Sequence, residues 1–217
     1  MSMRVWSGLA CLAAVVVIGL AVGRGPAPDR LDATVRDHLH GWLEQRSFKE
    51  LAGKVAAERR AGHGTYVTAV VPLLAAAAVA ASTSIRRPRL RLRLGAWAAW
   101  VVALLPTVPL AYALRVAFGR PGPGDVTVPA WSQGAYPSGG ALLVALGWTI
   151  GGALLVWLRP SWRRPLLALA ALALLVHALA RVAVGDHWLT DVAGSYLLAA
   201  GVALLADPLR PRSGGYG

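Results

Sequence analysis

The chain has 217 residues and a formal net charge of +12, with 56% apolar and 15% charged residues. Its apolar content excludes a disordered chain, which requires low hydrophobicity. Its single cysteine, Cys11, excludes a disulfide scaffold. Several apolar runs approach the length that spans a bilayer, which disfavours an ordinary cytosolic enzyme. The composition therefore predicts an all-α, polytopic membrane protein.

Six apolar segments, taken in chain order, each come close to the roughly 20 residues that a spanning helix requires. They cover residues 5–22, 65–85, 94–114, 139–158, 165–183 and 188–206. The sequence thus predicts one membrane domain over residues 1–217, built as a bundle of six transmembrane helices. Pro106 and Pro109 predict a kink in the third segment, because proline has no backbone N–H to donate inside a helix.

The first apolar segment has two interpretations. Met1 to Arg4 followed by an apolar stretch also fits a cleaved signal peptide. The apolar stretch is longer than the roughly 7–15 residues of a signal-peptide core. An uncleaved spanning helix is therefore favoured.

Arginine-rich segments predict the orientation of the bundle. Residues 86–93 contain five arginines and 159–164 contain three, with no acidic residue in either segment. Because cytoplasmic loops carry the excess of Lys and Arg, both should face the cytoplasm together with the two termini. Segments 24–64, 115–138 and 184–187 then face outside. The abundance of Ala, Leu, Gly, Arg and Pro is typical of a GC-rich bacterial genome, so a bacterial plasma membrane is the expected location.

Residues 24–64 are expected to form an amphipathic segment on the outer face. Within it, residues 31–60 mostly repeat apolar side chains at a spacing of three or four, which predicts a helix. Two placements remain open. The helix lies in the outer membrane interface, or it is a solvated helix packed on the outer end of the bundle.

Three polar clusters interrupt the apolar pattern, and the predicted topology places all three on the outer face. They are residues 115–123, 136–140 and 181–191. The orientation was derived from arginine counts alone, so the agreement is independent of these clusters. It favours one shared site over three unrelated polar segments.

Two of the clusters supply groups that bind phosphate. Arg181, with Arg120 or Arg115, can bind phosphate oxygens through bidentate guanidinium contacts. Ser138 and Gly139 stand at the expected start of a helix, where free backbone N–H groups and the helix dipole favour an anion. Taken singly, each residue has an ordinary structural explanation, such as an arginine extending to the interface or a serine helix cap.

His187 and Asp191 supply a candidate nucleophile with its orienting acid. Their i, i+4 spacing places them on one helix face. A carboxylate bound to one imidazole nitrogen fixes the tautomer and leaves the other nitrogen free to attack. Asp191 also falls inside a predicted span, where an acid is costly unless it has a partner. The combination favours phosphoryl transfer.

These residues resemble the type 2 phosphatidic acid phosphatase superfamily of membrane lipid phosphatases, which has a six-helix core. The family signatures are Lys-x6-Arg-Pro, Pro-Ser-Gly-His and Ser-Arg-x5-His-x3-Asp. Arg181, His187 and Asp191 match the third signature, with Ala180 in place of its leading Ser. The resemblance implies that His187 forms a phosphohistidine, Arg181 binds the phosphoryl oxygens and Asp191 orients His187. It also implies catalysis without a metal or other cofactor.

The other two signatures are degenerate. Pro137-Ser138-Gly139 matches the second, but Gly140 replaces the His that acts as general acid in the family. In the first signature, Arg115 replaces the Lys and Gly122 replaces the Arg, while Arg120 lies two residues earlier. His63 and His177 are candidate substitute acids.

We therefore expect an integral membrane hydrolase that acts on a lipid phosphate or a polyprenyl diphosphate at the outer face. Without a general acid, a leaving alkoxide, with a pKa roughly like that of water at about 15.7, is disfavoured. A leaving phosphate monoester, whose second pKa is about 6, is compatible. The alternative is a relative that binds a lipid phosphate without cleaving it. A channel is disfavoured because no charge lies mid-span.

The expected partners are the lipid substrate and the bilayer. No basic stripe with interleaved aromatic residues suggests nucleic acid. No group of His, Cys, Asp or Glu has metal-ligand spacing, since His38 and His40 point to different helix faces.

Overall fold

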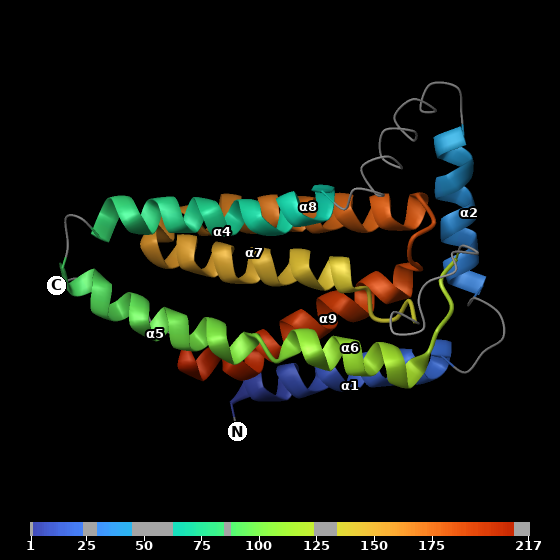
Figure 1. Ribbon diagram of the computed structural model, residues 1–217, viewed down its shortest axis with the longest axis horizontal. Helices are drawn as coiled ribbons and strands as arrows, with labels where there is room; N and C mark the ends of the chain where they lie inside the picture. The colour runs from blue at the N-terminus through green and yellow to red at the C-terminus, as the bar shows by residue number, and fades with distance from the viewer. Residues whose placement is uncertain (1, 24–29, 45–62, 85–87, 124–133, 211–217) are drawn as a thin grey trace.

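The computed structural model describes residues 2–23, 30–44, 63–84, 88–123 and 134–210. This part of the chain is all helical (Figure 1). Its helices are α1 (Met3–Gly23), α2 (Arg30–Glu44), α4 (His63–Ser84), α5 (Pro88–Leu104), α6 (Thr107–Phe118), α7 (Gly139–Leu158), α8 (Arg163–Ala183) and α9 (Leu189–Ala206), with 3₁₀ turns η2 (Pro160–Trp162) and η3 (Asp207–Leu209). The prediction of an all-α membrane protein is confirmed.

Five of the described helical stretches are long and apolar enough to cross a membrane. They are Met3–Gly23, Trp97–Phe118, Gly139–Leu158, Pro160–Ala183 and Leu189–Leu209. The second predicted span, 65–85, coincides with α4, whose apolar part, Val67–Ser82, is shorter. The number of six spans stays a prediction.

The third predicted span, 94–114, is divided into two helices, which confirms the expected distortion at proline. α5 ends at Leu104 and α6 begins at Thr107, with a turn between them. Pro106 cannot donate to the preceding turn. The Thr107 hydroxyl donates instead to the Leu104 carbonyl at 2.6 Å. This side-chain bond satisfies a carbonyl that the break would otherwise leave without its helical partner.

The long helices pack side by side through small residues. A Cβ added to Gly147 of α7 would lie 2.1 Å from the carbonyl oxygen of Ala69 in α4. Only glycine permits that approach of two helix backbones, as is common in helix pairs within membranes. On α8, by contrast, Leu172, Leu175 and Val176 are more than half exposed, as expected of a face that contacts lipid.

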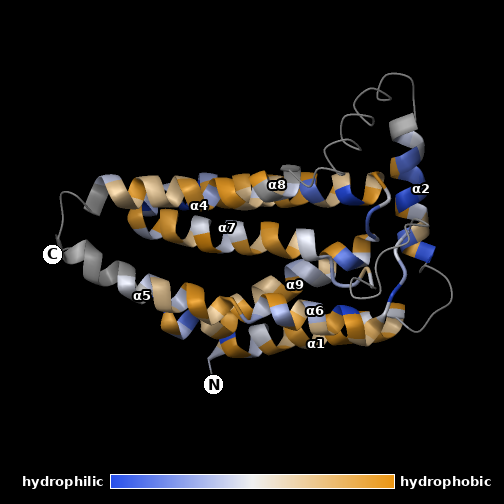
Figure 2. Ribbon diagram, in the orientation of Figure 1, coloured by the Kyte–Doolittle hydropathy of each residue, from blue (hydrophilic) through white to orange (hydrophobic). Residues whose placement is uncertain are grey.

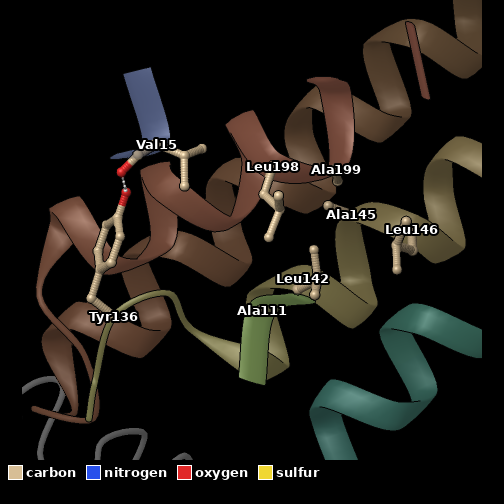
Figure 3. Packing of buried hydrophobic residues seen from close by; sticks show 8 residues of the cluster. All are labelled: Val15, Ala111, Tyr136, Leu142, Ala145, Leu146, Leu198 and Ala199. Atoms are coloured by element: carbon tan, nitrogen blue, oxygen red, sulfur yellow. Dashed lines mark hydrogen bonds between the residues drawn. The ribbon is translucent and has the colours of Figure 1, made fainter. Parts of the chain in front are cut away.

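The core cluster in Figure 3 connects the segment before α7 to α1. Tyr136 is completely buried, and its hydroxyl donates to the Val15 carbonyl at 2.5 Å. Leu142 of α7 and Leu198 of α9 belong to the same cluster. Burial is the main cause that raises the pKa of Tyr136, followed by the negative charge of Asp191. Tyr136 therefore serves as a structural hydrogen-bond donor that fixes the start of α7.

Helix α2 lies across one end of the bundle, roughly perpendicular to the long helices (Figure 1). Polar residues gather at this end, whereas the long helices are mainly apolar (Figure 2). α2 coincides with the first half of the helix expected over residues 31–60, and residues 45–62 lie outside the described part of the chain. The turn η2 between α7 and α8, which is flanked by arginines, lies at the opposite end.

Candidate active site

The three polar clusters meet at the end of the bundle that α2 covers. The end of α6, the start of α7 and the turn from α8 to α9 all lie there (Figure 1). Residues separated by more than 60 positions in the sequence thus share one region. The helices fix this arrangement, because each cluster lies at the terminus of a long, packed helix.

His187 and Asp191 face each other at the start of α9. Nδ1 of His187 lies 3.5 Å from Oδ2 of Asp191. That distance is longer than a well-formed hydrogen bond, although such bonds often tighten when a substrate binds. Oδ2 also accepts from the backbone N–H of Trp188 at 2.9 Å, which fixes the carboxylate in the first turn of α9.

His187 is 7% exposed and Asp191 is completely buried. Burial is the main cause that lowers the pKa of His187, because it disfavours the charged imidazolium. The Asp191 carboxylate close to Nδ1 raises this pKa, whereas the nearby charges of Arg181 and Arg115 lower it. The net direction of the pKa shift is downward, which favours the neutral imidazole, the form that a nucleophile requires.

The sequence predicts that Arg120 binds phosphate oxygens, but in the structure its guanidinium is bound to protein groups. Its Nη1 donates to Asp191 Oδ1 and to Thr190 Oγ1, both at 2.6 Å. Its Nη2 donates to Asp32 Oδ2 at 2.7 Å. The guanidinium is 2% exposed and bridges two buried carboxylates, neither of which is stable there without a cation. Arg120 therefore stabilises the Asp191 carboxylate and links it to α2.

Asp32 is a member of this network that sequence reasoning missed. It is completely buried, and it accepts from the Thr190 backbone N–H at 3.0 Å and from the Thr190 hydroxyl at 2.5 Å. The sequence contains one signal for it. Asp32 shares a helix face with Val35 and Leu39, so an acid lies on the apolar side of an amphipathic helix. An acid in that position needs a buried partner.

Arg181 lies in the last turn of α8. Its Nη1 is 2.8 Å from Oδ2 of Asp186, and its side chain is 21% exposed. The chain turns between the two residues at Gly185, whose φ of 71° lies in the left-handed region that favours glycine. The turn folds the acid back over the guanidinium. Arg181 thus holds an anionic group in this structure.

Ser138 fixes the start of α7 against α9. Its hydroxyl accepts from the Ala141 N–H at 3.3 Å, so Ser138 caps the helix as its sequence position predicts. Its own N–H donates to the Asp191 carbonyl at 3.1 Å. Ser195 Oγ lies 2.8 Å from the carbonyl oxygens of both Ser138 and Asp191. The amide-rich start of α7 is thereby placed beside the His187 and Asp191 pair.

Arg115 lies on the other side of the start of α7. Its Nε donates to the Gly134 carbonyl at 2.8 Å. A Cβ added to Gly139 would lie 3.5 Å from Nη1 of Arg115, which places the guanidinium next to the first residue of the helix. Two arginines, Arg115 and Arg181, therefore flank α7 where its N-terminal dipole favours an anion.

The region above Gly140 holds Thr65 of α4, a neighbour that sequence reasoning also missed. A Cβ added to Gly140 would lie 3.2 Å from Thr65 Cγ2, 3.6 Å from Thr65 Oγ1 and 3.7 Å from Arg181 Nη2. A larger side chain would therefore enter the site beside Arg181 but would press against the Thr65 methyl group. No sequence signal relates Thr65 to Gly140, because their contact depends on how α4 and α7 pack.

The two candidate substitute acids have different outcomes. The side chain of His63 lies outside the described part of the chain. His177 is buried one turn before Arg181 in α8, with Nδ1 3.4 Å from the Tyr196 hydroxyl. Within the described residues, its Nε2 is buried without a hydrogen-bond partner. The same described residues contain no group of three His, Cys, Asp or Glu side chains that could hold a metal.

Comparisons with known proteins identify a fold neighbour. No protein-family model and no curated protein matches the sequence. A solved structure does match: the first transmembrane PAP2 type phosphatidylglycerolphosphate phosphatase from Bacillus subtilis. The match has a TM-score of 0.63 and 17% identity and covers 94% of this chain and 95% of that chain. The chain therefore has the fold of a transmembrane PAP2-type phosphatase over nearly its whole length.

Proposed function

We propose that this protein is an integral membrane phosphatase that hydrolyses a lipid phosphate through a phosphohistidine at His187. The observation that carries the proposal is the pairing of buried His187 with Asp191, next to Arg181 and the start of α7. The fold shared with a transmembrane PAP2-type phosphatase supports it. The resemblance of residues 181–191 to the third family signature supports the same chemistry.

The reaction would proceed in two steps. Nε2 of His187 attacks the phosphorus, and the bond from phosphorus to the leaving oxygen breaks. Arg181, Arg115 and the first amides of α7 hold the equatorial phosphoryl oxygens as their negative charge develops. Asp191 stabilises the cationic ring of the intermediate. Water then attacks the phosphorus, the bond to nitrogen breaks, and inorganic phosphate leaves with neutral His187 restored.

Gly140 decides which leaving group suits this site. In the family signature this position carries the histidine that protonates the leaving oxygen, and here Thr65 lies above a glycine. A threonine hydroxyl is too weak an acid to replace an imidazole. An alkoxide leaving group therefore lacks its proton, whereas a phosphate monoester, with a second pKa of about 6, departs without one. Polyprenyl diphosphates are the favoured substrates, and a monoester such as phosphatidic acid is a poor one.

The proposed site faces the outside of a bacterial plasma membrane. Arg159, Arg163 and Arg164 lie about η2, at the end of the bundle opposite α2 and the site. The positive-inside rule assigns that arginine-bearing end to the cytoplasm. An amphiphilic substrate fits this placement, because its tail stays in the bilayer while its headgroup reaches the helix ends.

The test is phosphate release by the purified protein, with 5 mM EDTA present to test metal independence, on three substrates. These are a polyprenyl diphosphate, phosphatidic acid and phosphatidylglycerophosphate, the last being the substrate class in the name of the fold neighbour. The expected order places the diphosphate first, and His187→Gln should release none. If wild type and His187→Gln are equally active, or if the diphosphate is untouched, the proposal is wrong.

The second candidate function is binding of a lipid phosphate without cleavage. Two observations favour it: Gly140 replaces the family's acid, and Arg120 is bound to two carboxylates. Rapid quenching in alkaline denaturant, which preserves the P–N bond, after incubation with a diphosphate ³²P-labelled at its terminal phosphorus separates the two functions. Label on the His187 peptide excludes a pure binding protein. Saturable lipid-phosphate binding with no labelled peptide and intact substrate supports one.

A further inference from the structure

The buried network behind the site connects α2 to the first turn of α9. Asp32 contacts Arg120 and Thr190, and Arg120 contacts Asp191. The two residues that this network joins, Asp32 and Arg120, are 88 positions apart in the sequence. We propose that Asp32 is a positioning residue: through Arg120 it keeps the Asp191 carboxylate oriented toward His187, and its own charge offsets that of Arg120, so the negative charge beside His187 is not cancelled. Its catalytic consequence rests on the proposed function.

Two carboxylates share one guanidinium, so the buried group of Asp32, Arg120 and Asp191 carries a net charge of −1 when all three are ionised. If Asp32 were neutral, Arg120 and Asp191 would form a neutral pair. The negative charge beside His187 would then be largely cancelled. In a buried site such a change is only weakly screened by water.

The contacts of Arg120 also fix the orientation of the Asp191 carboxylate. Oδ1 of Asp191 accepts from Arg120, which leaves Oδ2 for the Trp188 N–H and for His187. Asp32 accepts from the other terminal nitrogen of the guanidinium, Nη2, and Thr190 accepts from Nη1, the nitrogen that also donates to Asp191. A guanidinium with three planar contacts cannot rotate freely, so it fixes which oxygen of Asp191 faces the imidazole.

A second contact between α2 and the site supports the same assignment. The guanidinium carbon of Arg36 lies 5.3 Å from the centre of the Trp188 ring, and that of Arg120 lies 5.6 Å from it. The Trp188 indole N–H donates to the Pro121 carbonyl at 3.0 Å. α2 therefore contacts Trp188, which directly follows His187, and Thr190, which directly precedes Asp191.

Several other ionisable groups surround His187, and their charges are unchanged by a substitution at Asp32. They are Arg181 and His177 of α8, Asp186 of the following turn, and Arg115 of α6. A change in the titration of His187 on substitution of Asp32 can therefore be assigned to the network behind Asp191.

The test measures the titration of His187 without any substrate. Exchange of its C2 hydrogen for deuterium, followed by mass spectrometry of the His187 peptide against pH, gives the titration midpoint in the intact protein. Asp32→Asn should move the midpoint down by about half a unit or more, because a nearby negative charge favours the imidazolium. The matched control is Asp37→Asn, which removes an acid that is 63% exposed on the same helix and should leave the midpoint unchanged.

Arg120→Gln provides a rescue that a purely structural role would not produce. Alone, it should raise the midpoint, because both carboxylates lose their cation. Combined with Asp32→Asn, it should return the midpoint close to the wild-type value, since one charge of each sign is gone. If Asp32→Asn does not fold, the comparison of Arg120→Gln with the double variant measures the same effect of Asp32.

Two results would overturn the inference: equal midpoints for wild type and Asp32→Asn, or for Arg120→Gln and the double variant. Either result is independent of catalysis. In the phosphate-release assay, Asp32→Asn should lower kcat about tenfold with little change in KM, because Asp32 acts through Asp191 and does not touch the substrate. A shifted midpoint in a protein that releases no phosphate would contradict the proposed function alone.

Discussion

Asp186 places a carboxylate oxygen 2.8 Å from Nη1 of Arg181, the guanidinium that is proposed to bind a phosphoryl oxygen. The ion pair is within a single turn of the chain, so its formation requires little ordering. The side chains of Arg181 and Asp186 are 21% and 8% exposed, so this is not a surface ion pair. A phosphate, with two negative charges and three acceptor oxygens, can still compete with a single carboxylate for the guanidinium. If Arg181 binds the substrate as proposed, Asp186 competes with it.

Substitution Asp186→Asn should therefore strengthen anion binding. Removal of the competing charge is expected to lower the inhibition constant of inorganic phosphate about threefold to tenfold, which corresponds to about 1 kcal/mol. Competition against diphosphate hydrolysis measures this constant. Asp207→Asn, whose acid pairs with Arg4 and Arg210, serves as the control. An unchanged or higher inhibition constant in Asp186→Asn would show that Asp186 instead helps to orient Arg181.

Restoring the missing imidazole should broaden the range of leaving groups. Gly140→His alone presses its Cβ against the Thr65 methyl group, since that contact would measure 3.2 Å. Thr65→Ser removes this methyl group and keeps the hydroxyl. The double variant is expected to hydrolyse phosphatidic acid about 10²-fold faster than wild type, the lower range of general-acid catalysis. Its diphosphate activity should change little.

The control for that experiment is Gly140→Gln with Thr65→Ser, which fills the same space without a group that titrates near neutral pH. Initial rates of phosphate release on both substrates are the measurement. An equal gain in the glutamine variant would attribute the effect to packing. No gain in either variant would show that proton donation to the leaving group does not limit hydrolysis of the monoester.

Local relationships in this site were predictable from the sequence, and long-range ones were not. The i, i+4 spacing of His187 and Asp191 predicts that the two side chains approach each other, although His187 precedes α9 and does not lie on a helix face. The prolines after residue 104 divide a span. By contrast, the contact of Asp32 with Arg120 joins residues 88 positions apart and depends on how α2 crosses the bundle. Hydrophobic periodicity specifies a helix face but not the partner of that face. The sequence therefore suggests phosphate as the partner of Arg120 and does not identify Asp32 as its actual partner.

The lowered pKa of His187 sets the expected pH profile. Burial disfavours the imidazolium, so the neutral nucleophile persists below the ordinary histidine value of about 6.5. The kcat/KM for diphosphate hydrolysis should therefore stay at its plateau as pH falls through 6.5 and decline only at lower pH. Asp191→Asn should move this decline in kcat/KM to still lower pH, because the Asp191 carboxylate raises the pKa of His187. The same substitution should also lower the plateau value of kcat/KM. A limb above pH 6.5 in wild type would contradict this account of the site.

Arg120→Lys should destabilise the protein although it keeps the positive charge. The guanidinium reaches Asp32 and Asp191 with two different nitrogens, at 2.7 and 2.6 Å. One ammonium group on a flexible stem cannot reproduce that planar bridge, so at least one buried carboxylate loses its partner. Losing one partner of a buried pair costs about 3–5 kcal/mol. Thermal unfolding in detergent should show a Tm lower by several degrees. Arg36→Lys, whose guanidinium also lies over the Trp188 ring but whose side chain is 33% exposed, should change the Tm little. Equal Tm values for Arg120→Lys and wild type would mean that the lysine ammonium satisfies both acids.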